Sequence, residues 1–182
     1  MKIFAETERL ILRELLPSDD KGMFELDSDK DVHKFLGNKP VENIEQCRDV
    51  IEFVRQQYIT NGIGRWAVIE KTTNNFLGWA GLKLVKEETN NHSNFYDIGY
   101  RLIKRHWGKG FATESGIASL DYGFKILQLE TIYGAAESNH KASKKILEKI
   151  GLNYIETYDR ETTPTDWFKI TRQNCIDKKI YL

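Results

Sequence analysis

The sequence is poor in cysteine and proline, with two and three of these residues among 182. Cys47 and Cys175 have no CxxC or CxxH partner, which argues against a disulfide framework and a zinc site. No apolar run approaches the roughly 20 residues that cross a bilayer. Lysine plus arginine number 27, as do aspartate plus glutamate, so no net charge favours nucleic acid or a membrane surface. We therefore expect no metal, nucleic acid or membrane among the partners of this chain.

The first residues, MKIFAETERLILRELL, carry acids within their apolar part and lack a cleavage site of small residues. This pattern is not that of a secretory signal peptide, so the chain is expected to be cytoplasmic. Its length and its apolar content of 40% predict one domain over residues 1–182, with a sizeable core.

Hydrophobic periodicity predicts the order of helices and strands. Apolar residues at spacings of three and four predict a helix from Asn43 to about Gly62, after an earlier helix that starts near Pro17. Two later helices are expected, one that opens within residues 105–114 and carries Ile117, Leu120, Phe124 and Leu127, and one over residues 139–150. The predicted strands are 10–12, 65–70, 76–85, 95–103, 131–136, 153–158 and 166–172. This order indicates an α/β (α+β) fold, a mixed sheet with helices packed on it.

The stretch RHWGKGFATE, residues 105–114, joins the strand at 95–103 to the next helix. Its region contains four cationic side chains: Arg101, Lys104, Arg105 and Lys109. The first amides of a helix lack intrahelical acceptors and carry partial positive charge, and glycines let a ligand approach the backbone closely. A phosphate or pyrophosphate group is the natural ligand of such a loop.

Three phosphate-binding patterns compete for this loop. The Walker A pattern GxxxxGK[ST] is absent. The dinucleotide pattern GxGxxG fits Gly108 and Gly110 but meets Thr113 at its last glycine, and Glu137 would be its ribose-binding acid. The pattern R-x-x-G-x-G-x-A is matched in full by Arg105, Gly108, Gly110 and Ala112.

That last pattern resembles the pyrophosphate loop of the GNAT superfamily of N-acetyltransferases. The segments TERLILRE, DIGYRLIKRHWGKGFATE and ESNHKASKKILEKIGL resemble its Rim-type branch, in the correct order over nearly the whole chain. The resemblance implies a mixed, mostly antiparallel central sheet flanked by helices and splayed between the fourth and fifth predicted strands. It also implies acetyl-CoA as co-substrate and direct acetyl transfer to a primary amine, either a protein N-terminus or a small amine.

The resemblance also implies the residues that hold acetyl-CoA. The pantetheine arm would bond the strand backbone near Leu102 and Ile103, and Asn139 and Ser143 fit an N-x-x-x-S pattern near the thioester. Two alternatives stay open: Arg105 contacts phosphate or braces the loop, and Asn139 contacts the arm or caps a helix. The implied cofactor-binding residues are Leu102, Ile103, Arg105, Gly108, Lys109, Gly110, Phe111, Ala112, Thr113, Asn139 and Ser143.

Acetylation needs a neutral amine, whereas a lysine-type amine has a pKa near 10.4 and an α-amine one near 7.7–8.0. A base is therefore expected. Asp97 stands where the Rim-type pattern carries glutamate and is the first candidate. The reserves are Glu70, Glu137 and His92, of which His92 is expected to be exposed.

The resemblance leaves the general acid open. Many relatives place a tyrosine where this chain has Ile146, so the proton donor to the thiolate is Ser143, Tyr100 or absent. A non-catalytic module that binds CoA or a nucleotide is the alternative function. The acceptor and the oligomeric state, monomer or homodimer, are not readable from the sequence.

Overall fold

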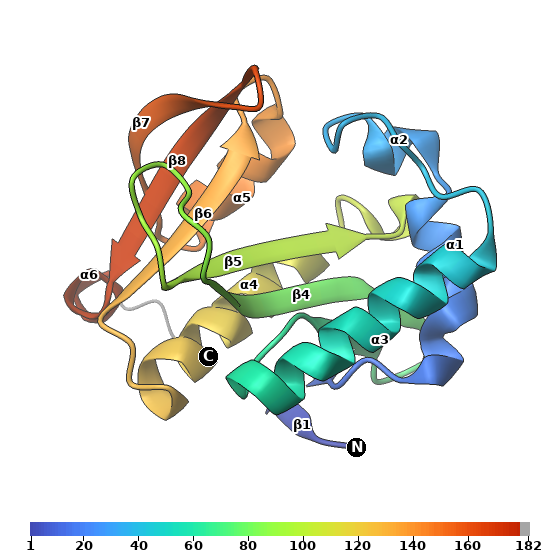
Figure 1. Cartoon of the computed structure of the whole chain (residues 1–182). Coiled ribbons are helices and arrows are strands. Elements are labelled where there is room, and N and C mark those ends of the chain that lie inside the picture. Colours follow the sequence, from blue (N-terminus) through green and yellow to red (C-terminus); the bar gives the residue numbers. More distant parts are fainter. Residues whose placement is uncertain (179–182) are drawn as a thin grey trace.

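A computed structural model describes residues 1–178 and contains one eight-stranded sheet in the order β1-β2-β3-β4-β5-β6-β8-β7 (Figure 1). The strands are β1 (Ile3–Glu6), β2 (Leu10–Arg13), β3 (Trp66–Glu70), β4 (Phe76–Val85), β5 (Phe95–Leu102), β6 (Thr131–Glu137), β7 (Asn153–Arg160) and β8 (Thr163–Thr171). The α-helices are α1 (Asp20–Asp27), α2 (Lys30–His33), α3 (Ile44–Asn61), α4 (Phe111–Asp121), α5 (Lys141–Lys149) and α6 (Arg172–Asp177). Short helical turns are η1 (Pro17–Asp19), η2 (Lys104–His106) and the π-helical η3 (Tyr122–Ile126).

The ends of α3 follow from its sequence. The Asn43 side chain accepts from the Gln46 amide, while the Gln46 side chain accepts from the Asn43 amide, a capping box that satisfies two otherwise unpaired donors. At the other end, Gly62 has a φ of 70°, the left-handed conformation that ends a helix at low cost for glycine. The predicted helix is confirmed at both ends.

Three short elements were not predicted: β1, α2 and α6. Because β1 adds a strand at the start, the predicted fourth and fifth strands are β5 and β6. The predicted helix at 139–150 begins two residues later, at Lys141. The helix that carries Ile117 and Leu120 begins at Phe111, within the loop predicted to open it, and gives way to η3 after Asp121.

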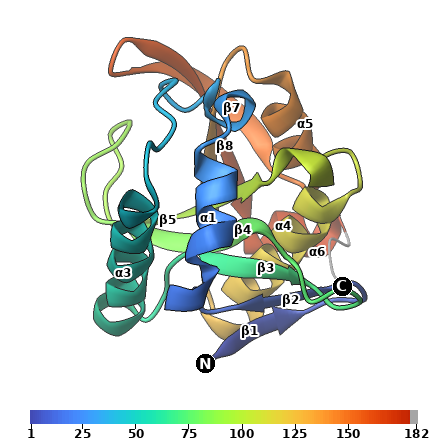
Figure 2. The same ribbon diagram turned by 90° about the vertical axis from the view of Figure 1, so that its right-hand side faces the viewer.

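The helices cover both faces of the sheet (Figure 2). On one face, α4 and α5 pack in a core with Leu82, Ile98 and Phe168. On the other face, α1 and α3 pack in a second core with Ala67 and Ile69. We call these the α4 face and the α1 face.

The sheet is splayed between β5 and β6. These strands form the only parallel pair of the sheet, and a single register pair, Asp97 with Tyr133, joins them. By contrast, eight register pairs join β5 to β4. Figure 1 shows β6, β7 and β8 diverging from β5. Because the two strands are parallel, both run toward the open end of this gap. The predicted splayed, mostly antiparallel sheet is confirmed, whereas a dinucleotide site of the GxGxxG type requires a parallel, doubly wound sheet.

Candidate active site

The glycine loop follows β5 at the open end of the gap. Gly108 and Gly110 have φ values of 72° and 83°, in the left-handed region that favours glycine. Gly110 is the N-cap of α4, whose first intrahelical bond runs from Glu114 N to Gly110 O at 3.0 Å. The amides of Phe111 to Thr113 therefore have no intrahelical acceptor and suit an anion.

The turn between β1 and β2 braces this loop. Arg9 pairs with Glu114 at 2.5 Å, donates to the Lys109 carbonyl at 3.1 Å and lies over the Phe111 ring at 4.5 Å. Burial alone would raise the pKa of Glu114, but hydrogen bonds from Thr7 and Arg9 outweigh it and lower that pKa. Glu114 is thus an anion at neutral pH that fixes the first turn of α4.

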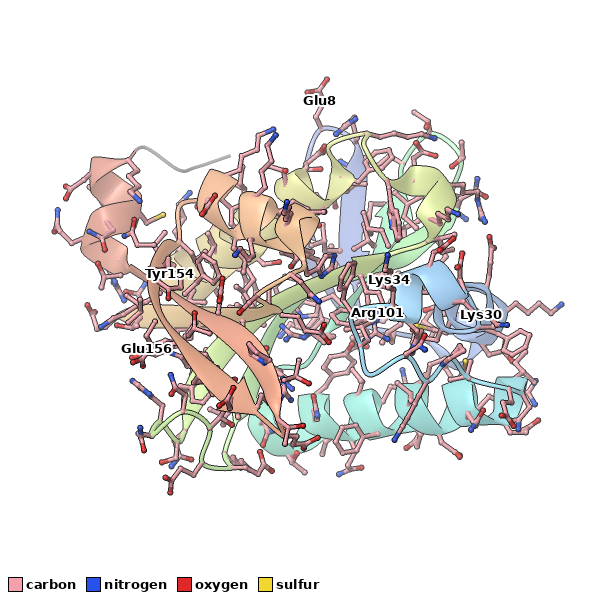
Figure 3. The ribbon with its side chains drawn as sticks, turned by 90° about the horizontal axis from the view of Figure 1, so that it is seen from above. Glu8, Lys30, Lys34, Arg101, Tyr154 and Glu156 are labelled. Carbon is pink, nitrogen blue, oxygen red and sulfur yellow. The ribbon has the colours of Figure 1, made fainter. Side chains whose placement is uncertain are left out.

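Three of the four cations near the loop pair with acids of α1 and α2. The pairs are Arg101–Asp27 at 2.6 Å, Lys104–Asp31 at 2.5 Å and Arg105–Glu25. In Figure 3, Arg101 extends from β5 beside α2, which begins at Lys30 and is followed by Lys34. Lys109 makes no ion pair with any residue in the described part of the chain. The cationic cluster therefore holds the acidic helices on the sheet, with Arg105 paired to Glu25 of α1.

The gap exposes part of the β5 backbone. Both backbone groups of Ile103 are bonded, its N–H to Leu77 O at 2.9 Å and its carbonyl to an amide of η2. Alternate residues of a strand direct their backbone groups to opposite sides, so Tyr100 and Leu102 direct theirs into the gap. The Leu102 carbonyl accepts from Trp107 Nε1 at 2.7 Å. The Leu102 N–H and the Tyr100 backbone form the open edge.

On the α4 face, β5 contacts the first turn of α5. The Tyr100 hydroxyl donates to the Ser143 carbonyl at 2.9 Å and lies 3.4 Å from Ser143 Oγ. Burial raises the pKa of Tyr100. Ile146 is partly buried against the core of this face. Tyr100 thus brings a phenol from β5 to the first turn of α5.

Asn139 lies in the exposed turn between β6 and α5. The N-cap of α5 is His140 rather than Asn139, and its side chain makes no capping bond. The capping role considered for Asn139 is therefore wrong, because the helix begins one residue too late for it.

Asp97 points to the α1 face. One carboxylate oxygen accepts from Arg65, which is buried and also donates to the Asp97 carbonyl at 2.7 Å. Burial lowers the pKa of Arg65, and the Asp97 charge opposes that shift. The guanidinium lies over the Trp79 ring at 5.5 Å. Asp97 is therefore paired with a buried arginine, and its second carboxylate oxygen is not bonded to any residue between 1 and 178.

The reserve bases lie in different surroundings. His92 is half-buried, its Nδ1 lies 2.6 Å from Asn90 O, and its ring contacts Tyr133 and Trp167. The expectation of a plainly exposed His92 is wrong because the β4–β5 loop folds over these rings. Glu70 accepts from Thr73 in the β3–β4 turn, away from the gap. Glu137 ends β6 at the open end.

Two features of the site were missed in the sequence. Asp166 of β8 is buried and accepts from Lys144 Nζ at 2.6 Å and Thr157 Oγ1 at 2.8 Å, which ties α5 to the sheet. His140 stacks on Phe35, from the segment after α2, with ring centroids 4.2 Å apart. Asp166 lies outside the motifs, and His140 occupies an unspecified position of the N-x-x-x-S pattern, so only the fold reveals their contacts.

The arrangement fits CoA. An open strand edge can bond the amides of a pantetheine arm, and the left-handed glycines with the free amides of α4 can bond a pyrophosphate. Among residues 1–178, no group of three histidine, cysteine or acidic side chains has the geometry to hold a metal ion, and no helix is long and apolar enough to span a membrane.

Known proteins resemble this chain in sequence and structure. A model of the acetyltransferase (GNAT) domain family matches residues 9–153. The N-acetyltransferase p20 of Bacillus licheniformis, described as uncharacterized, is 32% identical over 144 residues, 79% of each chain. A GNAT-family acetyltransferase from Bacillus anthracis has a TM-score of 0.77 at 23% identity, covering 93% of this chain and 98% of that one. Spermidine N-acetyltransferase from Vibrio cholerae, solved with CoA and spermine, has a TM-score of 0.75 at 20% identity, covering 93% and 99%. This chain therefore belongs to the GNAT acetyltransferase family and is an N-acetyltransferase that uses acetyl-CoA.

Proposed function

We propose that this enzyme transfers the acetyl group directly to a primary amine, a protein N-terminus or a small amine, as a member of the Rim-type branch. The observation that carries the proposal is the β5–β6 gap. Its open strand edge ends at the glycine loop, and the carboxylate of Asp97 lies on its α1 face. A cofactor bound along the edge and an amine approaching from the α1 face would meet inside this gap.

The cofactor side is proposed residue by residue. The amides from Gly108 to Thr113 and the Lys109 ammonium would bond the pyrophosphate, and Tyr100 and Leu102 would bond the pantetheine arm. Asn139 and Ser143 would lie near its thioester end. When bound, acetyl-CoA supplies the acetyl group as a thioester.

Tyr100 is proposed as the proton donor to the departing sulfur. Its raised pKa keeps the phenol protonated at neutral pH. The Ser143 hydroxyl lies 3.4 Å from the phenol oxygen and would relay a proton to it. A thiol has a pKa near 8.5, so its thiolate leaves readily and the donor needs to supply only modest help. Asp97 would attract and orient the acceptor ammonium, because its ion pair with Arg65 leaves one oxygen for a further partner.

Release of CoA thiol from acetyl-CoA tests this function. The acceptors are matched pairs: an N-terminal peptide and its N-blocked form, and spermidine and its fully acetylated form. Spermidine is included because a solved neighbour is an N-acetyltransferase of that polyamine. We expect thiol release with at least one free amine and none with its blocked partner. CoA binding without release by any amine would support the non-catalytic module instead.

Asp97→Asn tests the role of the carboxylate. The amide still accepts from Arg65 but does not attract an ammonium, so the acceptor KM should rise about tenfold, equivalent to roughly 1.4 kcal/mol of binding. The matched control is Asp159→Asn, an exposed acid of β7. An unchanged KM in a folded Asp97→Asn enzyme would remove Asp97 from the acceptor site.

A further inference from the structure

His140 lies where the two faces of the gap meet. It precedes the first turn of α5, at the open end of the gap. Its ring stacks on Phe35 with an interplanar angle of 14°. In Figure 1, the segment after α2 extends toward α5 across this open end. The stack therefore connects the acidic helical region of the α1 face to the helix on the other side of the gap.

His140 is also close to the cofactor side. Residues three apart on a helix share a face, so the N-cap His140 stands one turn before Ser143. The Ser143 carbonyl accepts from the Tyr100 hydroxyl, which we assign to the departing sulfur. The imidazole therefore comes from the same end of α5 as Ser143, and Phe35 stacks on its ring.

The imidazole is chemically available. Neither ring nitrogen hydrogen-bonds to a residue in the described part of the chain, and neither is among its fully buried unpaired atoms. Burial lowers the pKa of His140 below its ordinary value of 6.5, so the ring is neutral at pH 7 and can accept a proton. The charged groups on the elements packed around it are Lys34, Glu137, Lys141 and Lys144.

We propose that His140 is the residue that takes the proton from the acceptor ammonium, with Phe35 as the residue that positions its ring. This inference rests on the proposed function. An ammonium loses one proton to His140 and becomes a neutral amine. Its nitrogen then bonds the acetyl carbon as the carbon–sulfur bond breaks, and the sulfur leaves with the electron pair and takes the proton of the Tyr100 hydroxyl. The second proton of the nitrogen then returns to the Tyr100 oxygen. His140 returns its proton to solvent, and Asp97 stays paired with Arg65.

The proposal also selects a class of acceptor. Proton transfer from an α-ammonium to a histidine with a pKa below 6.5 is unfavourable, with an equilibrium constant that disfavours it by at least about 15-fold. For a lysine-type ammonium the same equilibrium is disfavoured by at least about 10⁴-fold. We therefore expect peptide N-termini and other amines of similarly low pKa to be better acceptors than spermidine. Equal use of both classes would contradict this selectivity.

The test compares His140→Gln with wild type from pH 5 to 9. Wild-type kcat/KM should rise with pH through a value below 6.5 and then level off. In His140→Gln, this rise of kcat/KM at acidic pH (the acidic limb) should disappear. Its turnover at pH 7 should fall about 10²–10⁴-fold, with CoA affinity unchanged. The deficit should shrink as pH approaches the pKa of the amine. His92→Gln is the matched control and should keep both the rate and the limb.

Phe35→Ala should lower turnover severalfold and move the pKa of His140 toward 6.5, measured by NMR titration of its ring, and Phe35→Tyr should restore both. This measurement needs no turnover. A His140→Gln enzyme with near-full turnover and an intact acidic limb, or a ring that titrates above 6.5 in wild type, would overturn the proposal. If wild type acetylates no amine, the proposed function itself has failed.

Discussion

Gly110 is the residue at which the loop tolerates least change. Its φ of 83° is strained for any other residue, and a Cβ would lie 3.4 Å from Arg9 Nη2. Gly110→Val should cost about 1–2 kcal/mol of stability and weaken CoA binding about 10–100-fold, the loss of one charge-assisted hydrogen bond. Gly62→Val is the matched control, since Gly62 has a φ of 70° with open space around it, far from the gap. A titration that gives equal CoA affinity for the two variants would remove Gly110 from the site.

At this same scale, the sequence located the loop but not the partners of its cations. Arg101 and Asp27 are separated by 74 residues, and the sequence alone presents Arg101 as part of an anion site. Folding brings the two groups together, so each neutralises the other. Pairing of this kind depends on distance in space, which residue types and spacing do not contain. His140 was missed for a related reason, because its surroundings come from Phe35 on another element.

Among the elements, α5 carries Ser143 and follows His140, and its attachment to the sheet depends on one buried acid. Burial alone would raise the pKa of Asp166, but hydrogen bonds from Lys144, Ser138 and Thr157 outweigh it and lower that pKa. A lowered carboxyl pKa adds stability that is present above the unfolded value of about 3.8 and is lost as the pH falls through the folded value. Asp166→Asn should therefore destabilise the protein by about 1.5–3 kcal/mol at pH 7.

The difference in thermal midpoint between wild type and Asp166→Asn should shrink below pH 4. Asp159→Asn, an exposed acid on β7, is the control and should leave the midpoint nearly unchanged. A pH-independent difference would mean that the charge of Asp166 is not what holds α5.

Long elements were predictable, whereas of the four-residue elements only β2, with its apolar run Leu10–Leu12, was predicted. The strand β4 and the helix α3 have enough residues for their periodicity, and α3 also has its own cap and stop residues. By contrast, β1 and α2 have four residues each, too few for a period to appear. The start of α5 was predicted two residues early because the chain first turns after Glu137, with the His140 amide bonded to the Glu137 carbonyl at 2.8 Å.

For the whole molecule, the gap in the sheet sets the expected response to ligands. Its existence came from the family resemblance, because missing strand pairing leaves no mark on composition or periodicity. CoA that completes the β5 edge binds only the folded chain, and at 100 times its dissociation constant it adds about 2.7 kcal/mol. For a chain of this size, that should raise the thermal midpoint by about 5–11 °C. NAD should give no comparable shift, since β5 and β6 are the only parallel strands of the sheet.

Hydrogen exchange with bound CoA should slow at the amides of Tyr100 and Leu102, while the already bonded amide of Ile103 should change little. Stabilisation by NAD without CoA, or protection spread evenly over the sheet, would contradict the assignment of the gap to the cofactor.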